Sequence, residues 1–123
     1  MPVGNVIGGG MHAKSVNYLK PDFQEFLVIP QTKKFVDAVL IMKKIHEQTG
    51  KTLEDRRVRG ELDEENAWST SLGNEDVLNI LNEARKNLED ESGNKIKIGI
   101  DVASSTFYSG KSYNYKNGNV KRN

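Results

Sequence analysis

The stretch KIKIGIDVA, residues 95–103, decides the fold. One face of it carries only β-branched apolar residues, namely Ile96, Ile98, Ile100 and Val102. The other face carries Lys97, Gly99 and Asp101. This period of two predicts a β-strand. Since α/β folds place ligands and metals at the C-terminal ends of parallel strands, Asp101 is a candidate ligand. The alternative is an aspartate that only hydrogen-bonds its own turn.

Two more strands are predicted before it. Residues 22–30, DFQEFLVIP, are rich in aromatic and β-branched residues and end at a proline. Both faces of this segment are largely apolar, which predicts a strand that is buried on both sides. Residues 3–7, VGNVI, form a shorter candidate strand that runs into three glycines.

Two helices are predicted between these strands. Residues 33–48 have apolar side chains at helical spacing, and Gly50 follows as a stop; the stripe consists of Phe35, Val39, Met42 and Ile45. A second helix begins at Asn74, a predicted N-cap, and ends before Gly93. Its stripe consists of Val77, Ile80, Leu81, Ala84 and Leu88. The charged segment 51–65 between them is interpreted as a solvated connection, and a loop of this length is either functional or disordered.

Composition excludes several classes of protein. The 123 residues fit one domain, and the net charge of +1 gives no long-range attraction to nucleic acid or anionic lipid. The chain has no cysteine, so neither disulfides nor thiolate metal sites can form. It has no secretory signal pattern and no apolar stretch near the roughly 20 residues of a membrane span. We therefore expect a cytoplasmic protein that binds neither membrane nor nucleic acid.

Three short motifs carry candidate chemistry. GGGMHAK, residues 8–14, is either a loop that lets a substrate approach the backbone or only a flexible turn. The acidic run 63–65 is either a functional cluster or a solvated stretch of charge. SGKS, residues 109–112, fails as a phosphate-binding Walker loop, because Thr106 stands where the motif needs glycine. His46 fits a partly exposed position at a helix C-terminus.

Read in order, four segments resemble consecutive motifs of the enolase family, the phosphopyruvate hydratases of glycolysis. They are PVGNVIGGGMHA, DFQEFLVIP, DEENAW and IKIGIDVASSTFYSGKSY, and they run from residue 2 to about residue 115. The resemblance implies an α/β fold, a partial (β/α) barrel of enolase type in the order strand, strand, helix, helix, strand over residues 1–115. Residues 116–123 would be a polar tail. A whole barrel needs about 250 residues, so only its first elements are expected here.

The resemblance also implies roles for five residues. His12 matches a histidine that closes over the substrate, and Gln24 and Glu25 match a pair that faces it. Glu64 matches the catalytic acid that protonates the departing hydroxide. Asp101 matches the first ligand of Mg²⁺, which holds the negative charge of the enediolate. The implied reaction is a lyase step between 2-phosphoglycerate and phosphoenolpyruvate.

The chain departs from the family pattern around the acid. Enolases usually carry Gly-Asp-Glu-Gly-Gly there, whereas this chain has Leu62, Asp63, Glu64, Glu65 and Asn66. The glycines are lost, and Glu65 adds a like charge beside the acid. The catalytic lysine, two magnesium carboxylates and the phosphate-binding groups should lie in later strands. We therefore expect no hydratase activity from the isolated chain. The alternatives are a chain that completes its site by self-association or with a partner, and a non-catalytic binding module.

Overall fold

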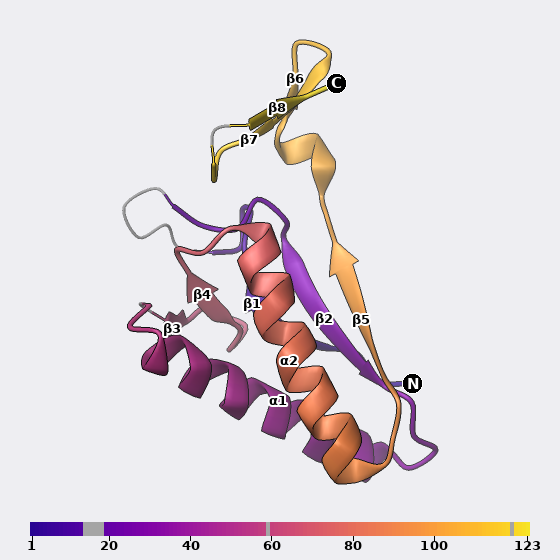
Figure 1. The fold of residues 1–123 in the computed structure, drawn as a ribbon. Coiled ribbons are helices and arrows are strands. Elements are labelled where there is room, and N and C mark those ends of the chain that lie inside the picture. Colours follow the sequence, from indigo (N-terminus) through magenta and orange to yellow (C-terminus); the bar gives the residue numbers. More distant parts are fainter. Residues whose placement is uncertain (14–18, 59, 119) are drawn as a thin grey trace.

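The protein is a mixed α/β structure in which two helices cover one face of a sheet (Figure 1). The computed structural model describes residues 1–13, 19–58, 60–118 and 120–123. The main sheet has the strand order β3-β4-β1-β2-β5. Its strands are β1 (Gly4–Gly8), β2 (Glu25–Pro30), β3 (Gly60–Leu62), β4 (Trp68–Thr70) and β5 (Ile96–Asp101). The sheet is open, with β3 at one edge and β5 at the other.

Strand β2 forms the two longest strand pairings of the main sheet. It runs antiparallel to β1 on one side and to β5 on the other. A parallel pair occurs between β1 and β4. The expectation that Asp101 ends a parallel strand was therefore wrong, because β5 joins the sheet through an antiparallel partner.

The two faces of β2 differ in burial. Phe26 and Val28 are fully buried beneath the helices, at 0% exposure. Leu27 and Ile29, on the opposite face, are only partly buried. The prediction of burial on both sides was therefore only half right, because no second layer of the described residues covers the face opposite the helices. Ile100 on the edge strand β5 is 40% exposed for a related reason, since no further strand follows it in the sheet.

The core lies between this sheet and the helices α1 (Phe35–Asp55) and α2 (Asn74–Ser92). Its members come from all of these layers, and they are Val6, Ile7, Phe26, Val28, Ile41, Ile45, Val77, Leu81, Ala84, Leu88 and Ile96. The burial of these apolar side chains is the main favourable term in the stability of such a domain.

Helix α1 differs from its prediction in length and in orientation. It continues through Gly50 to Asp55, and its buried residues are Ala38, Ile41, Ile45, Thr49 and Leu53. The predicted stripe was wrong at Phe35 and Val39, which are 70% and 40% exposed. Two apolar stripes compete at the start of this helix, and packing against the sheet selects the one that contains Ile41.

Helix α2 confirms the predicted apolar stripe, and all five of its members are buried. Its N-cap is Gly73 rather than Asn74. The Asn74 side chain instead accepts a hydrogen bond from the backbone N–H of Phe23, at 3.1 Å. Gly93 ends the helix in the left-handed conformation, at φ 69°, as glycines at this position usually do.

The charged segment after α1 holds structure that its composition did not predict. Strands β3 and β4 form an antiparallel hairpin that pairs Gly60 with Thr70 and Leu62 with Trp68. The predicted order of strand, strand, helix, helix, strand is therefore incomplete, because this hairpin stands between the helices. The hairpin joins the sheet through the contact of β4 with β1.

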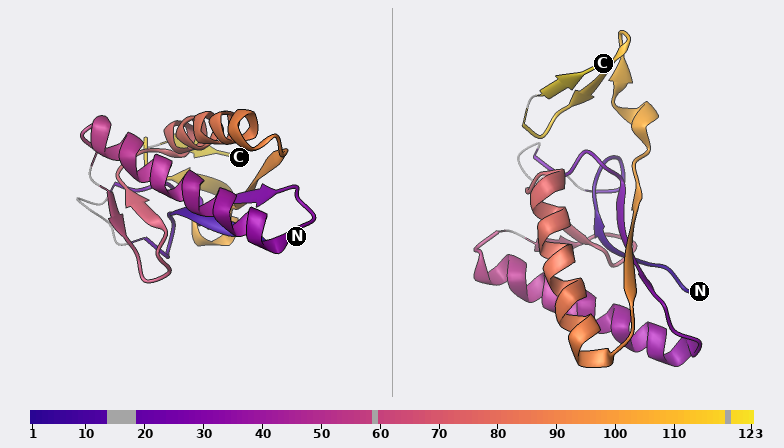
Figure 2. Two further views of the ribbon diagram at one scale, coloured as in Figure 1. Left: turned by 90° about the horizontal axis from the view of Figure 1, so that it is seen from below. Right: turned by 45° about the vertical axis from the view of Figure 1, so that its right-hand side comes forward.

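The C-terminal residues form a small second sheet beyond the end of β5 (Figure 2). A 3₁₀ turn (Ser104–Thr106) leads into β6 (Tyr108–Ser109), β7 (Ser112–Tyr115) and β8 (Val120–Arg122). Phe107 packs against Tyr115, with ring centroids 5.1 Å apart. The side-chain amide of Asn117 donates to the carbonyls of Lys20 at 2.9 Å and Leu72 at 3.0 Å. The hydrogen bonds of Asn117 connect the small sheet to the main body.

Glu89 links the end of α2 to the start of β5. Its carboxylate accepts hydrogen bonds from the backbone N–H of Ile96, at 2.7 Å, and from the Arg85 guanidinium, at 3.0 Å. The bond from Ile96, aided by the charge of Arg85, lowers the pKa of the Glu89 carboxyl. The contribution of this group to stability is therefore present above its unfolded-state pKa and is lost as the pH falls through the folded-state value.

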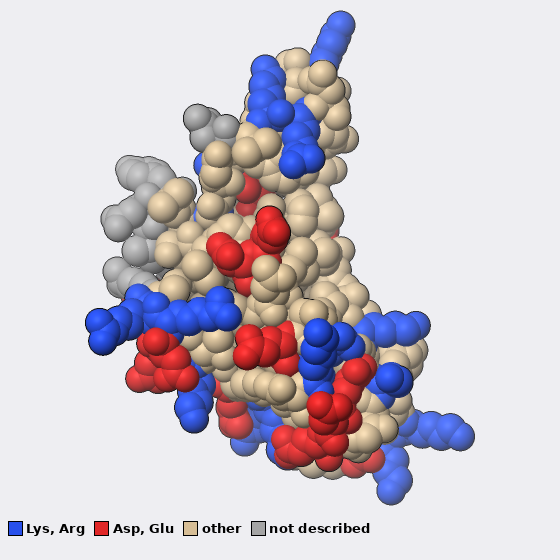
Figure 3. Space-filling model, viewed as in Figure 1, with Lys and Arg blue, Asp and Glu red and all other residues tan. Residues whose placement is uncertain are grey.

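Charge is unevenly distributed over the molecule (Figure 3). Basic and acidic side chains alternate over the helical part, whereas the C-terminal sheet shows basic side chains only. Residues 102–123 contain Lys111, Lys116, Lys121 and Arg122 and no acidic residue. Among the described residues, neither helix has an apolar stretch of the length needed to cross a bilayer.

Gly50 provides a test of the packing between α1 and the hairpin. An added Cβ would lie 2.7 Å from Cε2 of the Trp68 indole. That ring is held by its stacking on His46 and by the hydrogen bond from its N–H to the His46 carbonyl, at 2.9 Å. We therefore expect Gly50→Ala to lower the free energy of unfolding by about 1–3 kcal/mol.

Urea unfolding followed by circular dichroism measures this change. In an unobstructed helix the same substitution stabilises by about 0.5–1 kcal/mol, so the sign of the effect is decisive. Lys51→Ala, at an exposed neighbouring position, is the matched control and should change stability by less than about 0.5 kcal/mol. A Gly50→Ala protein as stable as the native chain would contradict the described packing.

Candidate functional site

The candidate site lies where three segments meet: the glycine-rich loop, the start of β2 and the turn between β3 and β4. His12 Nδ1 lies 3.5 Å from Oε1 of Glu25 and 3.9 Å from Oε2 of Glu65. One ligand atom from each of these three side chains falls within 4.8 Å of the other two. We call His12, Glu25 and Glu65 the imidazole–carboxylate triad. A protonated imidazole in this position forms ion pairs with both carboxylates.

The sheet register places Glu25 at the centre of the site. Glu25 pairs with Gly8 on β1 and with Asp101 on β5. The last residue of β5 therefore lies directly beside the first residue of β2, and the glycine-rich loop begins on the other side. This alignment brings together residues that are far apart in the sequence.

The glycines serve close packing as well as turning. An added Cβ on Gly9 would lie 2.7 Å from the Pro21 carbonyl oxygen, so no side chain fits there. The N–H of Gly9 donates to the carbonyl of Gln24, and the N–H of Gly10 donates to that of Pro21, both at 2.9 Å. The loop is therefore attached to the segment before β2. Lys14, the last residue of the GGGMHAK stretch, lies outside the described residues.

The acidic turn is held by one of its own side chains. The Asp63 carboxylate accepts backbone hydrogen bonds from Glu65, at 2.8 Å, and from Ala67, at 2.9 Å. Asn66 takes the left-handed conformation, at φ 61°, and its carbonyl lies 2.7 Å from Nε2 of His46. These contacts fix the backbone from which Glu65 extends toward His12. The acidic run is therefore an ordered turn.

The structure brings together most of the predicted site residues. His12 and Glu25 are neighbours, and Asp101 is next to Glu25 in the sheet. Glu64 lines a hollow together with Met11, His12, Ala13, Asp63 and Glu65, which we call the acidic hollow. Gln24 contributes its backbone, since its N–H donates to the Asp101 carbonyl at 3.0 Å.

Glu65 is the site residue that sequence reasoning missed. It was interpreted only as an extra like charge beside Glu64, whereas its carboxylate is the one that lies near His12. Its position in the sequence could have indicated this role, since three consecutive acids in a tight turn must point in different directions. Which of them faces the histidine depends on the turn geometry that Asp63 and Asn66 impose.

Asp101 is exposed and also bonds its own turn. Its Oδ1 accepts a hydrogen bond from the backbone N–H of Ala103, at 3.1 Å, and Ala103 has a φ of 44°. Asp101 therefore does hydrogen-bond its own turn, as the alternative interpretation of this residue expects. It does not exclude a ligand role, because a carboxylate has two oxygens and about four acceptor positions.

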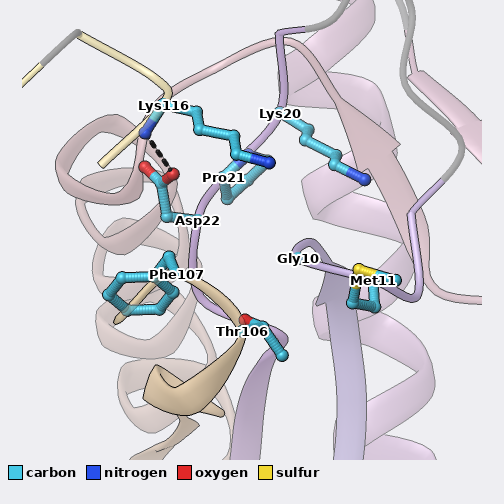
Figure 4. A pocket seen from close by; sticks show the side chains of 8 residues that line it. All are labelled: Gly10, Met11, Lys20, Pro21, Asp22, Thr106, Phe107 and Lys116. Atoms are coloured by element: carbon cyan, nitrogen blue, oxygen red, sulfur yellow. Dashed lines mark hydrogen bonds between the residues drawn. The ribbon is translucent and has the colours of Figure 1, made fainter. Parts of the chain in front are cut away.

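A second pocket lies on the other side of the glycine-rich loop (Figure 4). Its lining consists of Gly10, Met11, Lys20, Pro21, Asp22, Thr106, Phe107 and Lys116. Asp22 is buried and accepts a hydrogen bond from the backbone N–H of Lys116, at 2.7 Å. Partial burial, and the nearby charge of Lys116, lower the pKa of the Lys20 ammonium. The pocket marks the contact between the C-terminal sheet and the main body.

Comparisons with known proteins assign the family. The family model described as "Enolase, C-terminal TIM barrel domain" matches residues 1–123. The chain is 39% identical over 115 residues to an enolase of Archaeoglobus fulgidus and 38% identical over 125 residues to one of Pyrobaculum aerophilum. These matches cover 93% and 99% of this chain. The chain belongs to the enolase family, within its C-terminal barrel domain.

The match covers only part of each relative. It spans 28% of the Archaeoglobus enolase and 29% of the Pyrobaculum enolase. An enolase of Picrophilus torridus, 36% identical over 123 residues, is covered to 30%. The resemblance inferred from four short motifs is thus confirmed, as is its limitation to one part of the family's chain.

Asp63 provides a test of the acidic turn. We expect Asp63→Ala to lower the free energy of unfolding by about 1–3 kcal/mol, because two backbone N–H groups lose a charged acceptor. Hydrogen exchange at the Glu65 and Ala67 amides should accelerate in this variant. Asp63→Asn retains a carbonyl acceptor and should show a smaller effect on both measurements. Unchanged exchange at both amides in Asp63→Ala would show that the turn does not depend on this side chain.

Proposed function

We propose that this chain is the opening part of an enolase-type barrel and carries the proton-donating side of its site, without hydratase activity as an isolated chain. The observation that supports this most is the register of β2, which places Glu25 between Gly8 and Asp101. Family membership over residues 1–123 supports the same proposal. A cytoplasmic location belongs to it as well.

The proposed roles follow the chemistry of each side chain. Glu64, in the acidic hollow beside His12, would protonate the departing hydroxide of 2-phosphoglycerate. His12 would close over the substrate from the glycine-rich loop, and its contact with Glu25 at 3.5 Å would orient the ring. Gln24 and Glu25 would face the substrate from the start of β2. The product would be phosphoenolpyruvate.

Asp101 would hold Mg²⁺ in this proposal. Its donor chemistry fits, because Mg²⁺ prefers carboxylate oxygens and retains several waters. The bound ion would stabilise the negative charge of an enediolate. One carboxylate at an exposed strand end makes a weak site, so the isolated chain should bind Mg²⁺ loosely.

The expected inactivity follows from what the reaction requires. Removal of a proton beside a carboxylate needs a positioned base and more than one magnesium ligand. The family resemblance places the base and two further magnesium carboxylates in later barrel strands, and the chain spans 28–30% of its relatives. The proton-donating side alone cannot generate the intermediate that it would protonate.

A second candidate function has its own structural support. The main sheet is open at β3 and β5, and Ile100 on β5 is 40% exposed. Leu27 on the face opposite the helices is also incompletely buried. Open edges and exposed apolar positions favour pairing with another strand. A partner chain, or a second copy, would then supply the missing strands and complete the site.

An activity assay distinguishes the two candidates. The purified chain, with 2-phosphoglycerate and Mg²⁺, should produce no phosphoenolpyruvate absorbance above that of buffer. A full-length archaeal enolase is the positive control. Turnover that co-purifies with the chain and disappears in Glu64→Gln would overturn the proposed inactivity. Sedimentation at increasing concentration would then show whether the active species is an assembly.

Magnesium titration tests the role of Asp101. Amide signals around Asp101 should shift with added Mg²⁺ in the native chain and should stay unchanged in Asp101→Asn, because the amide lacks the negative charge of the carboxylate. Glu47→Gln, on the exposed surface of α1, is the matched control and should titrate like the native chain. Equal shifts in the native chain and in Asp101→Asn would remove Asp101 from the site.

A further inference from the structure

We propose that the imidazole–carboxylate triad of His12, Glu25 and Glu65 binds a divalent transition-metal ion of the zinc type, separately from any Mg²⁺ at Asp101. The proposal depends on this chain's own geometry and does not require the enolase reaction. It differs from the magnesium proposal in its ligands, since one of them is an imidazole nitrogen.

The distances fit a shared ion. Zinc binds histidine nitrogen and carboxylate oxygen at about 2.0–2.2 Å, and two such ligands at a tetrahedral angle are about 3.4 Å apart. His12 Nδ1 and Glu25 Oε1 are 3.5 Å apart. The Glu65 oxygen, at 3.9 Å from His12 Nδ1, belongs to an exposed side chain that needs only a small rotation to approach. Three protein ligands leave the fourth position of a tetrahedron to water.

The donor set selects the metal. Mg²⁺ takes oxygen ligands almost exclusively, whereas imidazole is suited to zinc, copper, iron and nickel. The chain has no cysteine, so no thiolate competes for such an ion. Its second histidine, His46, is stacked on Trp68 and lies 2.7 Å from the Asn66 carbonyl oxygen. His12 is therefore the histidine to which two carboxylates are presented.

The ligands are attached to separate, ordered pieces of backbone. Glu25 is fixed in the sheet between two strands. The Glu65 backbone is held by Asp63, and the His12 N–H donates to the Gly9 carbonyl at 3.0 Å. The other oxygen of Asp63, Oδ2, is buried with no hydrogen-bond partner among the described residues. This oxygen lies against Gly8, the residue paired with Glu25.

Glu65 is the residue that distinguishes this site from the family pattern. The family's motif has glycine at this position. A family member with that motif has the histidine and the strand glutamate but lacks the third carboxylate. In this chain the carboxylate that replaced the glycine is the one near His12. The substitution therefore converts a contact between two side chains into a set of three ligands.

Zinc titration of the whole chain tests the proposal. Calorimetry should show one saturable Zn²⁺ site, and the ring signals of His12 should shift while those of His46 stay in place. Glu65→Gln keeps the side-chain shape but removes the charged ligand, so its affinity should fall at least about tenfold, the loss that an outer-shell partner alone causes. Glu47→Gln, at an exposed position of α1 outside the site, is the matched control and should bind Zn²⁺ within about twofold of the native chain.

Several results would overturn the proposal: no saturable zinc site, equal affinities in the native chain and Glu65→Gln, or shifts at His46 in place of His12. Circular dichroism and thermal unfolding of each variant show whether it is folded. Asp101→Asn separates this proposal from the magnesium one, because it should abolish the magnesium shifts and leave the zinc affinity unchanged. The zinc measurements do not depend on whether the chain has hydratase activity.

Discussion

The two-sided antiparallel pairing of β2 is the constraint on which the rest of this structure depends. It directs Phe26 and Val28 into the core beneath both helices, because alternate residues of a strand face opposite sides. It also brings Glu25 between Gly8 and Asp101. A shift of one residue in this register would exchange the two faces, moving Phe26 out of the core and separating Glu25 from its neighbours. Core and candidate site therefore share one determinant.

The sequence correctly predicted those elements in which the apolar residues fall on a single face. Strand β5 and the stripe of α2 have one apolar face each, and both form as expected. Helix α1 begins with apolar residues on more than one side, so its buried face depends on the sheet that it meets. The β3–β4 hairpin could not be predicted from its composition, because it is stabilised by pairing with β1 and by the contact of Trp68 with α1. Burial in these cases is decided by tertiary contacts.

The sequence named a set of candidate residues but not their arrangement. Short motifs singled out His12, Glu25, Glu64 and Asp101, which the structure places near one another at one end of the sheet. They could not show that Glu65 lies near the histidine, since the direction of each acid depends on a left-handed residue, Asn66, and on the hydrogen bonds of Asp63. Nor could they show that the glycines are needed for close approach to Pro21 as well as for turning.

The attachment of the C-terminal sheet has a consequence for the order of folding. The hydrogen bond from Asn117 to Lys20 joins residues 97 positions apart, and the bond from Lys116 to Asp22 joins residues 94 positions apart. Closing so long a segment costs more chain entropy than the local contacts of α1 and α2, so it is favourable only after the main sheet exists. The aromatic residues Phe107 and Tyr115 would therefore stay in contact with solvent until the last stage. A fluorescence probe on Tyr115 would follow this closure as a phase later than helix formation.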